Sequence, residues 1–388
     1  MRKVHIPLLG RIIIAIILGV ICGNIFNEPL VKIFITFNSL FSQFLGFMIP
    51  LIIVGLVTPA IADIGKGAGR MLGITVGLAY LDTVVAGLLA YGVGSWLFPA
   101  MVANVPHIGP IAKAAEIAPY FTITIPPLMD VMTALILAFV AGLGIATAGL
   151  RNLKGFADDF KEVITLTISK AIIPLLPLYI FGIFINMTYS GEAYRILLVF
   201  AQIIVVIFVL HIFILLYLFC IAGGLHHRNP LRLLWTMIPA YMTALGTSSS
   251  AATIPVTLRQ ALKNGVSEDS AGFVIPLCAT IHMPGSSMKI TACALTVCML
   301  NGMPHDPMLF IYFILMLSIM MVAGPGVPGG AVMAALAPLG SILGFDADAQ
   351  ALIIALYIAM DSFGTACNVT GDGAIAMMVN SLSKPRRG

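Results

Sequence analysis

Apolar runs of about 20 residues or more recur along almost the whole chain, and no other feature constrains its fold so strongly. Hydrophobic residues make up 60% of the sequence and charged residues only 9%, a balance that no water-soluble core requires. A transmembrane β-barrel would show short segments of alternating hydrophobicity instead, and the sequence has none. The sequence therefore predicts an all-α polytopic membrane protein.

The order of the apolar segments changes in the C-terminal half of the chain. Uninterrupted segments are predicted near residues 7–26, 41–63, 72–98, 129–149, 162–188 and 194–222. Then a segment broken by small residues and proline precedes a long helix, first at 236–258 and 271–300, and again at 308–343 and 349–380. Paired broken segments of this kind are typical of the substrate site of a secondary transporter. Each is expected to form a re-entrant hairpin, the alternative being two kinked spanning helices.

The positions of Lys and Arg predict how the chain is oriented in the membrane, and the cysteine spacing predicts whether it binds metal or forms disulfides. Lys and Arg collect on one side of the predicted spans, which favours cytoplasmic termini in the plasma membrane, here a prokaryotic inner membrane. The net charge of +4 then reflects contact with the inner leaflet rather than with nucleic acid. The six cysteines lack CxxC or CxxH spacing and are expected to be core residues, not metal ligands or disulfides.

Five charged residues lie well inside apolar segments, where a charge is costly and is by default a functional candidate. They are Asp82, Lys170, Lys289, Asp361 and Asp372. For Lys170 we expect a side chain that reaches the membrane interface, and for the others an ion pair that only fixes packing is the alternative. Asp361 and Asp372 also share one predicted helix face with Thr365 and Asn368, because the spacing is four, three and four residues.

Three motifs carry a resemblance to a known family. "GTSSSAATIPVTL" at 246–258, "VAGPGVPGGA" at 322–331 and "DSFGTACNVTGD" at 361–372 resemble, in this order and spacing, the dicarboxylate/amino acid:cation symporters with the glutamate-transporter-like fold. The resemblance covers essentially the whole chain. It implies eight transmembrane helices, two re-entrant hairpins and a homotrimer in which a transport domain moves like an elevator against a scaffold.

The resemblance also implies a division of the chain. Residues 1–70 would hold scaffold helices 1 and 2, residues 71–128 helix 3 of the transport domain with an outer loop, and residues 129–188 scaffold helices 4 and 5. Residues 189–388 would hold the rest of the transport domain: helix 6, hairpin 1 (232–262), helix 7 (269–300), hairpin 2 (306–345) and helix 8 (347–380).

Site residues follow from the resemblance position by position. Those implied to bind substrate are Ser248, Ser249, Ser250, Gly324, Pro325, Gly326, Val327, Asp361, Gly364, Thr365 and Asn368. Those implied to bind sodium are Asn368, Asp372 and Thr280. Chemistry alone also suits these residues, since a zwitterion needs hydroxyl and amide donors for its carboxylate and one anion for its ammonium group. No cofactor other than the coupling ion is expected.

Two departures from the family pattern bear on function. Acidic amino acid carriers have an arginine three residues after the ammonium-binding aspartate, and here that position is Gly364, which favours a neutral substrate and a larger pocket. The family motif "NMDGT" reads "HMPGS" here, so that Pro284 replaces a sodium-binding carboxylate. We expect fewer sodium ions than the family norm, with a proton as a further candidate.

The second departure leaves two alternatives open for the coupling residues. Either Lys289 pairs with Asp82 as a fixed positive charge, or His282 and Asp82 form a protonatable relay. Tyr80 and Thr83, on the third predicted helix, are the other coupling candidates, because the family's buried sodium site uses a tyrosine and a threonine there.

The sequence thus favours a symporter that imports a small, neutral amino acid, and its partners are that substrate, the lipid bilayer and two further copies of the chain. A dicarboxylate or acidic amino acid substrate is the alternative. An enzyme is not expected, because the serines lack a G-x-S-x-G elbow and no histidine is placed beside them. A passive channel is not favoured, because it would not need two hairpin tips. A homologue that binds its ligand without transporting it stays a serious alternative.

Overall fold

The computed structural model describes residues 8–64, 69–103, 117–189, 191, 193–322 and 329–383. Within these ranges the chain forms helices and no strand, as the sequence predicts. The helices of the N-terminal half are α1 (Leu8–Ile25), α2 (Glu28–Ile64), α3 (Gly69–Ala103), α4 (Val131–Ala148), α5 (Arg151–Thr167), α6 (Ile173–Tyr189) and α7 (Ala193–His226). Those of the C-terminal half are α8 (Pro230–Thr236), α9 (Ile238–Thr247), α10 (Ser250–Lys263), α11 (Glu268–Ile281), α12 (Pro284–Leu300), α13 (Pro307–Val322), α14 (Gly330–Ser341), α15 (Ala347–Ala359) and α16 (Asp361–Ser383).

Several helices are long and apolar enough to cross a membrane. Among the described residues five continuous helical stretches qualify, and the bent pair α15–α16 makes up to six. The polytopic helical class is therefore confirmed, while the number of eight crossings stays a prediction. Two stretches are longer than the sequence pattern predicts, because α2 already begins at Glu28 and because α5 and α6 join through a π-helical segment at Ile168–Ile172. Lys170 lies exposed in that segment, as expected for a side chain that reaches the interface.

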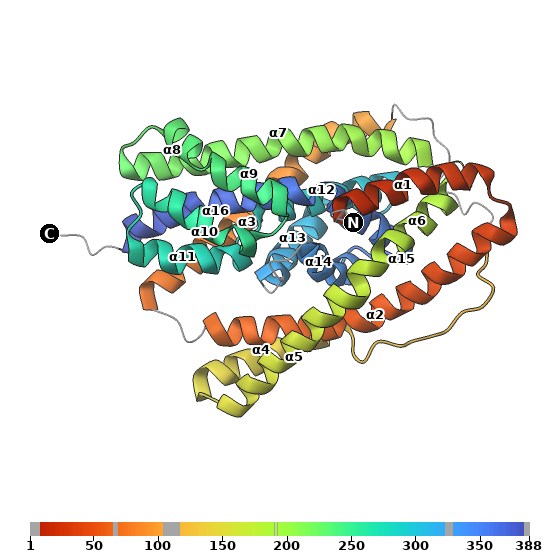
Figure 1. Ribbon diagram of the computed structural model, residues 1–388, viewed down its shortest axis with the longest axis horizontal. Coiled ribbons are helices and arrows are strands. Elements are labelled where there is room, and N and C mark those ends of the chain that lie inside the picture. The colour runs from red at the N-terminus through yellow and green to blue at the C-terminus, as the bar shows by residue number, and fades with distance from the viewer. Residues whose placement is uncertain are drawn as a thin grey trace, which may run out of the picture.

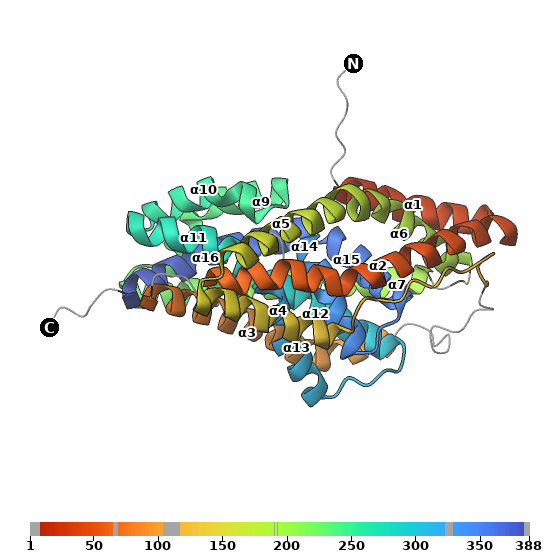
Figure 2. The same cartoon turned by 90° about the horizontal axis from the view of Figure 1, so that it is seen from below.

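The helices pack in two groups, and in Figure 1 α2, α4 and α5 run along the lower side of the molecule while α7 runs along the upper side. In one group α2 packs along α4, α5 and α6, and α1 packs along α6. In the other, α16 lies between α7 and the helices α9, α10 and α11, while α3 packs along α12. The turned view in Figure 2 places α9 and α10 on one face of the molecule and α13 on the opposite face. The groups meet where α14 contacts α2 and where α15 contacts α1 and α6.

Two helices that the sequence pattern predicts as continuous are interrupted. The predicted helix 271–300 is divided between Ile281 and Pro284, because proline has no N–H for the helix and disfavours helical backbone in the residue before it. The predicted helix 349–380 is divided at Met360, where α15 and α16 meet at an angle of 64°. Both interruptions free backbone groups inside the molecule, where they can bind a substrate or an ion.

Candidate functional site

The N-terminal ends of four helices meet around the start of α16. Ser248, just before α10, shares a hydrogen bond of 2.6 Å with the hydroxyl of Ser362. Gly329, just before α14, donates its N–H to Asp361 Oδ2 over 2.9 Å, and Gly285 at the start of α12 donates its N–H to Asn368 Oδ1 over 2.8 Å. Because helix N-termini carry partial positive charge, this arrangement favours an anionic group.

The serine cluster forms the turn between α9 and α10. Ser248 adopts a left-handed backbone with φ 51°, and Ser249 caps α10 by accepting the N–H of Ala252 over 3.3 Å. A non-glycine residue at positive φ stores strain and is typical of binding sites. At the predicted tip of hairpin 1 the hydroxyl of Ser248 therefore contacts α16, while Ser250 is buried in the first turn of α10. The predicted tip residues of hairpin 2, Gly324 to Val327, lie outside the described residues.

Asp361 is the first residue of α16, and Lys289 neutralises it. Lys289 Nζ lies 3.7 Å from Asp361 Oδ1, and both side chains are almost fully buried. The same ammonium donates to the carbonyl oxygen of Met360 over 3.3 Å and stands 3.8 Å from the centre of the Tyr357 ring. The Met360 carbonyl, which also accepts the N–H of Gly364, thus holds the lysine in place, and the aromatic ring adds a cation–π contact.

Gly364 does not enlarge the pocket, which corrects the expectation from the sequence. A Cβ atom at this position would overlap Cε and Nζ of Lys289. The space beside Gly364, where acidic carriers place an arginine, is thus filled by the ammonium end of Lys289 from the neighbouring helix α12. α16 carries no cation at position 364, and the cation nearest to it is Lys289 of α12.

His282 meets two carboxylates at once. Its Nε2 lies 2.8 Å from Asp82 Oδ2, and its Nδ1 lies 2.8 Å from Asp372 Oδ1. Of the two alternatives for the coupling residues, the structure has the contact between His282 and Asp82, whereas Lys289 pairs with Asp361. Thr83 stands beside this group and accepts the N–H of Met283 over 3.3 Å.

The residues expected to bind sodium belong to two sites, Asn368 and Asp372 to one and Thr280 to another, and their side chains make hydrogen bonds within the chain. Asn368 uses its amide for α12, because its Oδ1 accepts from Gly285 and its Nδ2 donates to Ser286 over 3.2 Å. Asp372 Oδ1 is bonded to His282, and Thr280 is exposed and donates to Leu277 of its own helix. Among the described residues no group of three or more His, Cys, Asp and Glu has the arrangement of a metal site. The side chains around Asp372 therefore do not fit a sodium ion as they stand.

Other sequence candidates divide between the site and its surroundings. The buried polar side chains around α16, among them Asp361, Lys289, His282 and Asp372, form what we call the polar cluster. Thr365 is buried on the same helix. Tyr80 turns away from the polar cluster and donates to the carbonyl of Leu315 on α13 over 3.4 Å. Two residues that the sequence did not indicate belong to the site: Tyr217 on α7, whose hydroxyl donates to Asp82, and Tyr357 on α15, whose hydroxyl shares a hydrogen bond of 2.9 Å with Ser286. A tyrosine inside an apolar run carries no signal of such a role.

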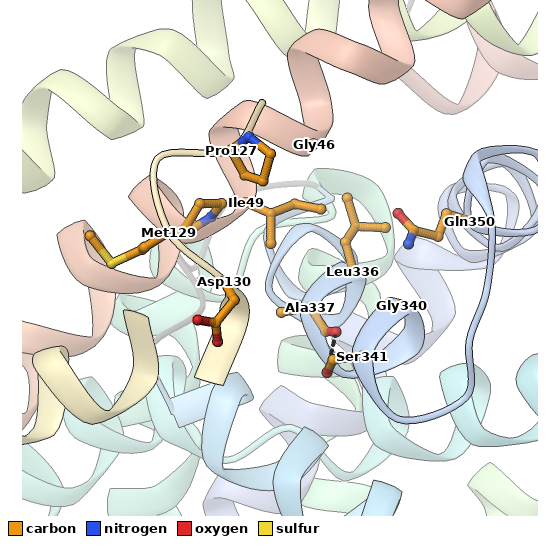
Figure 3. A pocket seen from close by; sticks show the side chains of 11 residues that line it. Gly46, Ile49, Pro127, Met129, Asp130, Leu336, Ala337, Gly340, Ser341 and Gln350 are labelled. Carbon is orange, nitrogen blue, oxygen red and sulfur yellow. Dashed lines mark hydrogen bonds between the residues drawn. The ribbon is translucent and has the colours of Figure 1, made fainter. Parts of the chain in front are cut away.

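A separate cavity lies away from the polar cluster, between α2 and α14 (Figure 3). Its volume is about 340 Å³. Its walls include Ile49 of α2, Pro127 and Met129 of the segment before α4, and Leu336 and Ala337 of α14. The walls are mostly apolar, and Asp130 at its rim caps α4 by accepting the N–H of Thr133 over 2.9 Å. This cavity is therefore poorly suited to a charged substrate, and the polar cluster remains the candidate site.

Comparison with protein families agrees with this architecture. The sequence model of the sodium:dicarboxylate symporter family matches residues 8–382, which is nearly the whole chain. Members of this family are membrane transporters rather than enzymes, and the family description implies sodium as the coupling ion. The long apolar helices, the interrupted segments and the buried carboxylates are all consistent with that assignment. The chain belongs to the sodium:dicarboxylate symporter family.

Proposed function

We propose that this chain is a sodium-coupled symporter that imports an acidic amino acid. The observation that carries the proposal is the buried pair of Lys289 and Asp361 at the start of α16, where four helix N-termini meet. This pair offers one negative and one positive partner within a few ångströms, beside backbone N–H groups that suit a carboxylate.

Charge matching separates three classes of substrate. An acidic amino acid satisfies both members of the pair, because its ammonium group can take Asp361 while its side-chain carboxylate takes Lys289. Its remaining carboxylate then faces the hydroxyls and N–H groups near Ser248 and Gly329. A neutral amino acid has a single carboxylate, which can meet either Lys289 or the hydroxyls and N–H groups near Ser248 and Gly329, but not both. A simple dicarboxylate would take Lys289 and leave Asp361 without a cation.

The energetic difference between these cases is large. Leaving one partner of a buried ion pair without a counter-charge costs about 3–5 kcal/mol. That cost corresponds to at least ~100-fold weaker binding of a dicarboxylate, whereas a neutral amino acid loses one charged contact of about 1.5–3 kcal/mol. The neutral substrate favoured by Gly364 rested on the absence of a nearby cation, and the position of Lys289 supplies one. We therefore favour the acidic alternative.

The family resemblance also supports an elevator movement in a homotrimer. The packing of the helices in two groups supports a division into scaffold and transport domains, and the apolar cavity between α2 and α14 lies where the groups meet. A loosely filled contact between two packed bodies is suited to sliding. The bias of Lys and Arg supports cytoplasmic termini in a prokaryotic inner membrane.

Uptake by purified protein in liposomes tests the substrate. Labelled L-aspartate, L-serine and succinate would be supplied with an inward sodium gradient at fixed pH. We expect aspartate uptake to exceed the other two clearly. In Lys289→Met, which keeps much of the side-chain length without the charge, aspartate uptake should fall while serine uptake is retained or rises.

Other outcomes of this assay have definite meanings. Preference for serine in the unaltered protein would contradict the role of Lys289 and support a neutral amino acid carrier. Preference for succinate would contradict the pairing of a substrate ammonium group with Asp361 and would mean that a donor other than Lys289 binds the second carboxylate of succinate. Binding of aspartate without uptake of any of the three would indicate a homologue that binds but no longer transports.

A further inference from the structure

His282, Asp82 and Asp372 form a buried row of carboxylate, imidazole and carboxylate. Both ring nitrogens lie 2.8 Å from a carboxylate oxygen, on α3 in one direction and on α16 in the other. The exposed fraction of the side chain is 0% for His282, 4% for Asp82 and 2% for Asp372. Two carboxylates this close and this dry repel each other unless a positive charge stands between them.

The ring is held in this position from several sides. It lies at the interruption between α11 and α12, where His282 has an extended backbone and closes α11 through its N–H. Gly371 of α16 leaves room for it, since a Cβ there would come within 2.9 Å of His282 Cε1. Tyr217 donates to the other oxygen of Asp82, and Thr83 anchors the next backbone N–H at Met283. The ring is thus a fixed part of the packing of α3, α7 and α16.

The hydrogen-bond chemistry defines the charge of the row. An ionised carboxylate accepts hydrogen bonds and does not donate them, so a ring that bonds two of them through both nitrogens is a positively charged imidazolium. If one carboxyl group held the proton instead, the row as a whole would carry the same charge. In both forms a chain-borne proton compensates one of the two negative charges.

We propose that the imidazole of His282 takes the place of a metal cation between Asp82 and Asp372, so that this position binds no sodium. A hard cation needs several oxygen ligands, and four side-chain oxygens at or beside this position already accept hydrogen bonds. Asp372 Oδ1 and both oxygens of Asp82 accept hydrogen bonds, and the neighbouring Asn368 Oδ1 accepts from Gly285. The group that stands between the two carboxylates is thus a side chain of the protein, and a proton shared within the row supplies the compensating charge.

This inference deepens the proposed function, because it says where the coupling sodium does not bind. It rests on that proposal only for its consequence, a lower number of sodium ions per transport cycle. Sodium binding can be measured without substrate, so that a failure of this inference and a failure of the proposed substrate are distinguishable.

Binding of ²²Na⁺ to purified protein tests the inference at fixed pH, with choline balancing the ionic strength. Asp372→Asn should bind the same number of sodium ions per chain as the unaltered protein. His282→Asn removes the tethered cation and should gain a sodium-dependent rise in melting temperature that the unaltered protein lacks at this position. A loss of one sodium ion in Asp372→Asn, or no gained stabilisation in His282→Asn, would overturn the inference.

A second test uses the unaltered protein and therefore does not depend on how well either variant folds. Structures by electron cryomicroscopy in high sodium and in choline should both show the His282 ring between Asp82 and Asp372. Density for an ion in contact with Asp372, with the ring turned away in sodium alone, would contradict the inference.

Discussion

At the scale of single residues, two buried basic side chains, Lys289 and His282, pair with aspartates of other helices. Lys289 stands beside Gly364, at the place of the arginine that acidic carriers have on the last helix, and His282 stands between two aspartates. In both cases the cation comes from the neighbouring segment around α12. A substitution on one helix is therefore understood only together with the helix that packs against it.

The close contact between Gly364 and Lys289 leads to a first prediction. In Gly364→Ala the added methyl group would overlap the end of the lysine side chain, which is flexible and can move away. We expect a loss of stability of up to about 3–5 kcal/mol and about tenfold or weaker binding of aspartate, because moving the buried ammonium of Lys289 separates it from Asp361. Calorimetric titration of substrate and a thermal melt would measure the two effects.

Gly272→Ala is the matched control for this change. Gly272 lies in α11, and a Cβ there would meet no atom within 4 Å. Replacing a glycine within a helix by alanine should stabilise the protein by about 0.5–1 kcal/mol and leave substrate affinity unchanged. Equal substrate affinities in the two variants would mean that the position of Lys289 does not matter for binding.

At the scale of elements, the interruptions in the helices determine where the site residues lie. The sequence indicated the turn before α10 and the second broken segment, because serine, glycine and proline clusters carry a local signal. The interruption at Met360 has no such signal: no proline or glycine stands next to it, and only the bonds of Lys289, Asp361 and Gly329 explain it. That break depends on tertiary contacts between distant segments, which a local pattern does not contain.

The interruption before α12 differs in this respect. Pro284 stands at the first position of the helix, and its effect on the preceding residue was available from the sequence. Because residues 271–300 are apolar over a length that can cross a membrane, the sequence analysis nevertheless predicted one continuous helix. The pairing of His282 with Asp82 was one of two alternatives, whereas the pairing of Lys289 with Asp361 was not among them, since sequence distance does not reveal which helices pack together.

Gly329 provides the second prediction, which concerns the start of α14. Its φ of 75° is unfavourable for any residue with a side chain, and its N–H binds Asp361. Gly329→Ala should destabilise the protein by about 1–2 kcal/mol and also weaken substrate binding, because the donor to Asp361 moves. Thermal unfolding and substrate titration would separate the two effects.

The turn at Gly344 offers a control with the same backbone strain. Its φ is 71°, it lies between α14 and α15, and a Cβ there would meet no atom within 4 Å. Gly344→Ala should lose a similar amount of stability and keep its substrate affinity. If both variants bound substrate as well as the unaltered protein, the bond from Gly329 to Asp361 would be irrelevant to binding.

At the scale of the whole molecule, two packed groups of helices share a contact that is incompletely filled. The group around α16 contains the candidate site, and the group around α2 contains no member of it. The cavity in Figure 3 lies between them, bounded by Ile49 on one side and by Leu336 and Ala337 on the other. Transport by a sliding domain requires such a surface to change its contacts during each cycle.

Filling this cavity is the third prediction. Ala337→Leu adds apolar atoms to a space of about 340 Å³, so that the arrangement described here should gain contacts without overpacking. If the group around α16 slides past α2, the gain favours this one arrangement over the others, and uptake should slow by roughly fivefold or more while substrate affinity is retained. Initial uptake rates in liposomes and calorimetric titration would measure the two quantities.

The neighbouring Ala335 supplies the control for this prediction. Ala335 is fully buried in α14 and does not border the cavity, so Ala335→Leu should overpack the core and lower the melting temperature. Ala337→Leu should melt at or above the temperature of the unaltered protein. Because the two changes add the same atoms one half-turn apart on one helix, a slow uptake in Ala337→Leu alone would point to the movement at the cavity. Unchanged uptake in a well-folded Ala337→Leu would mean that α14 and α2 keep their contact throughout the cycle, and the elevator proposal would then need a different sliding surface.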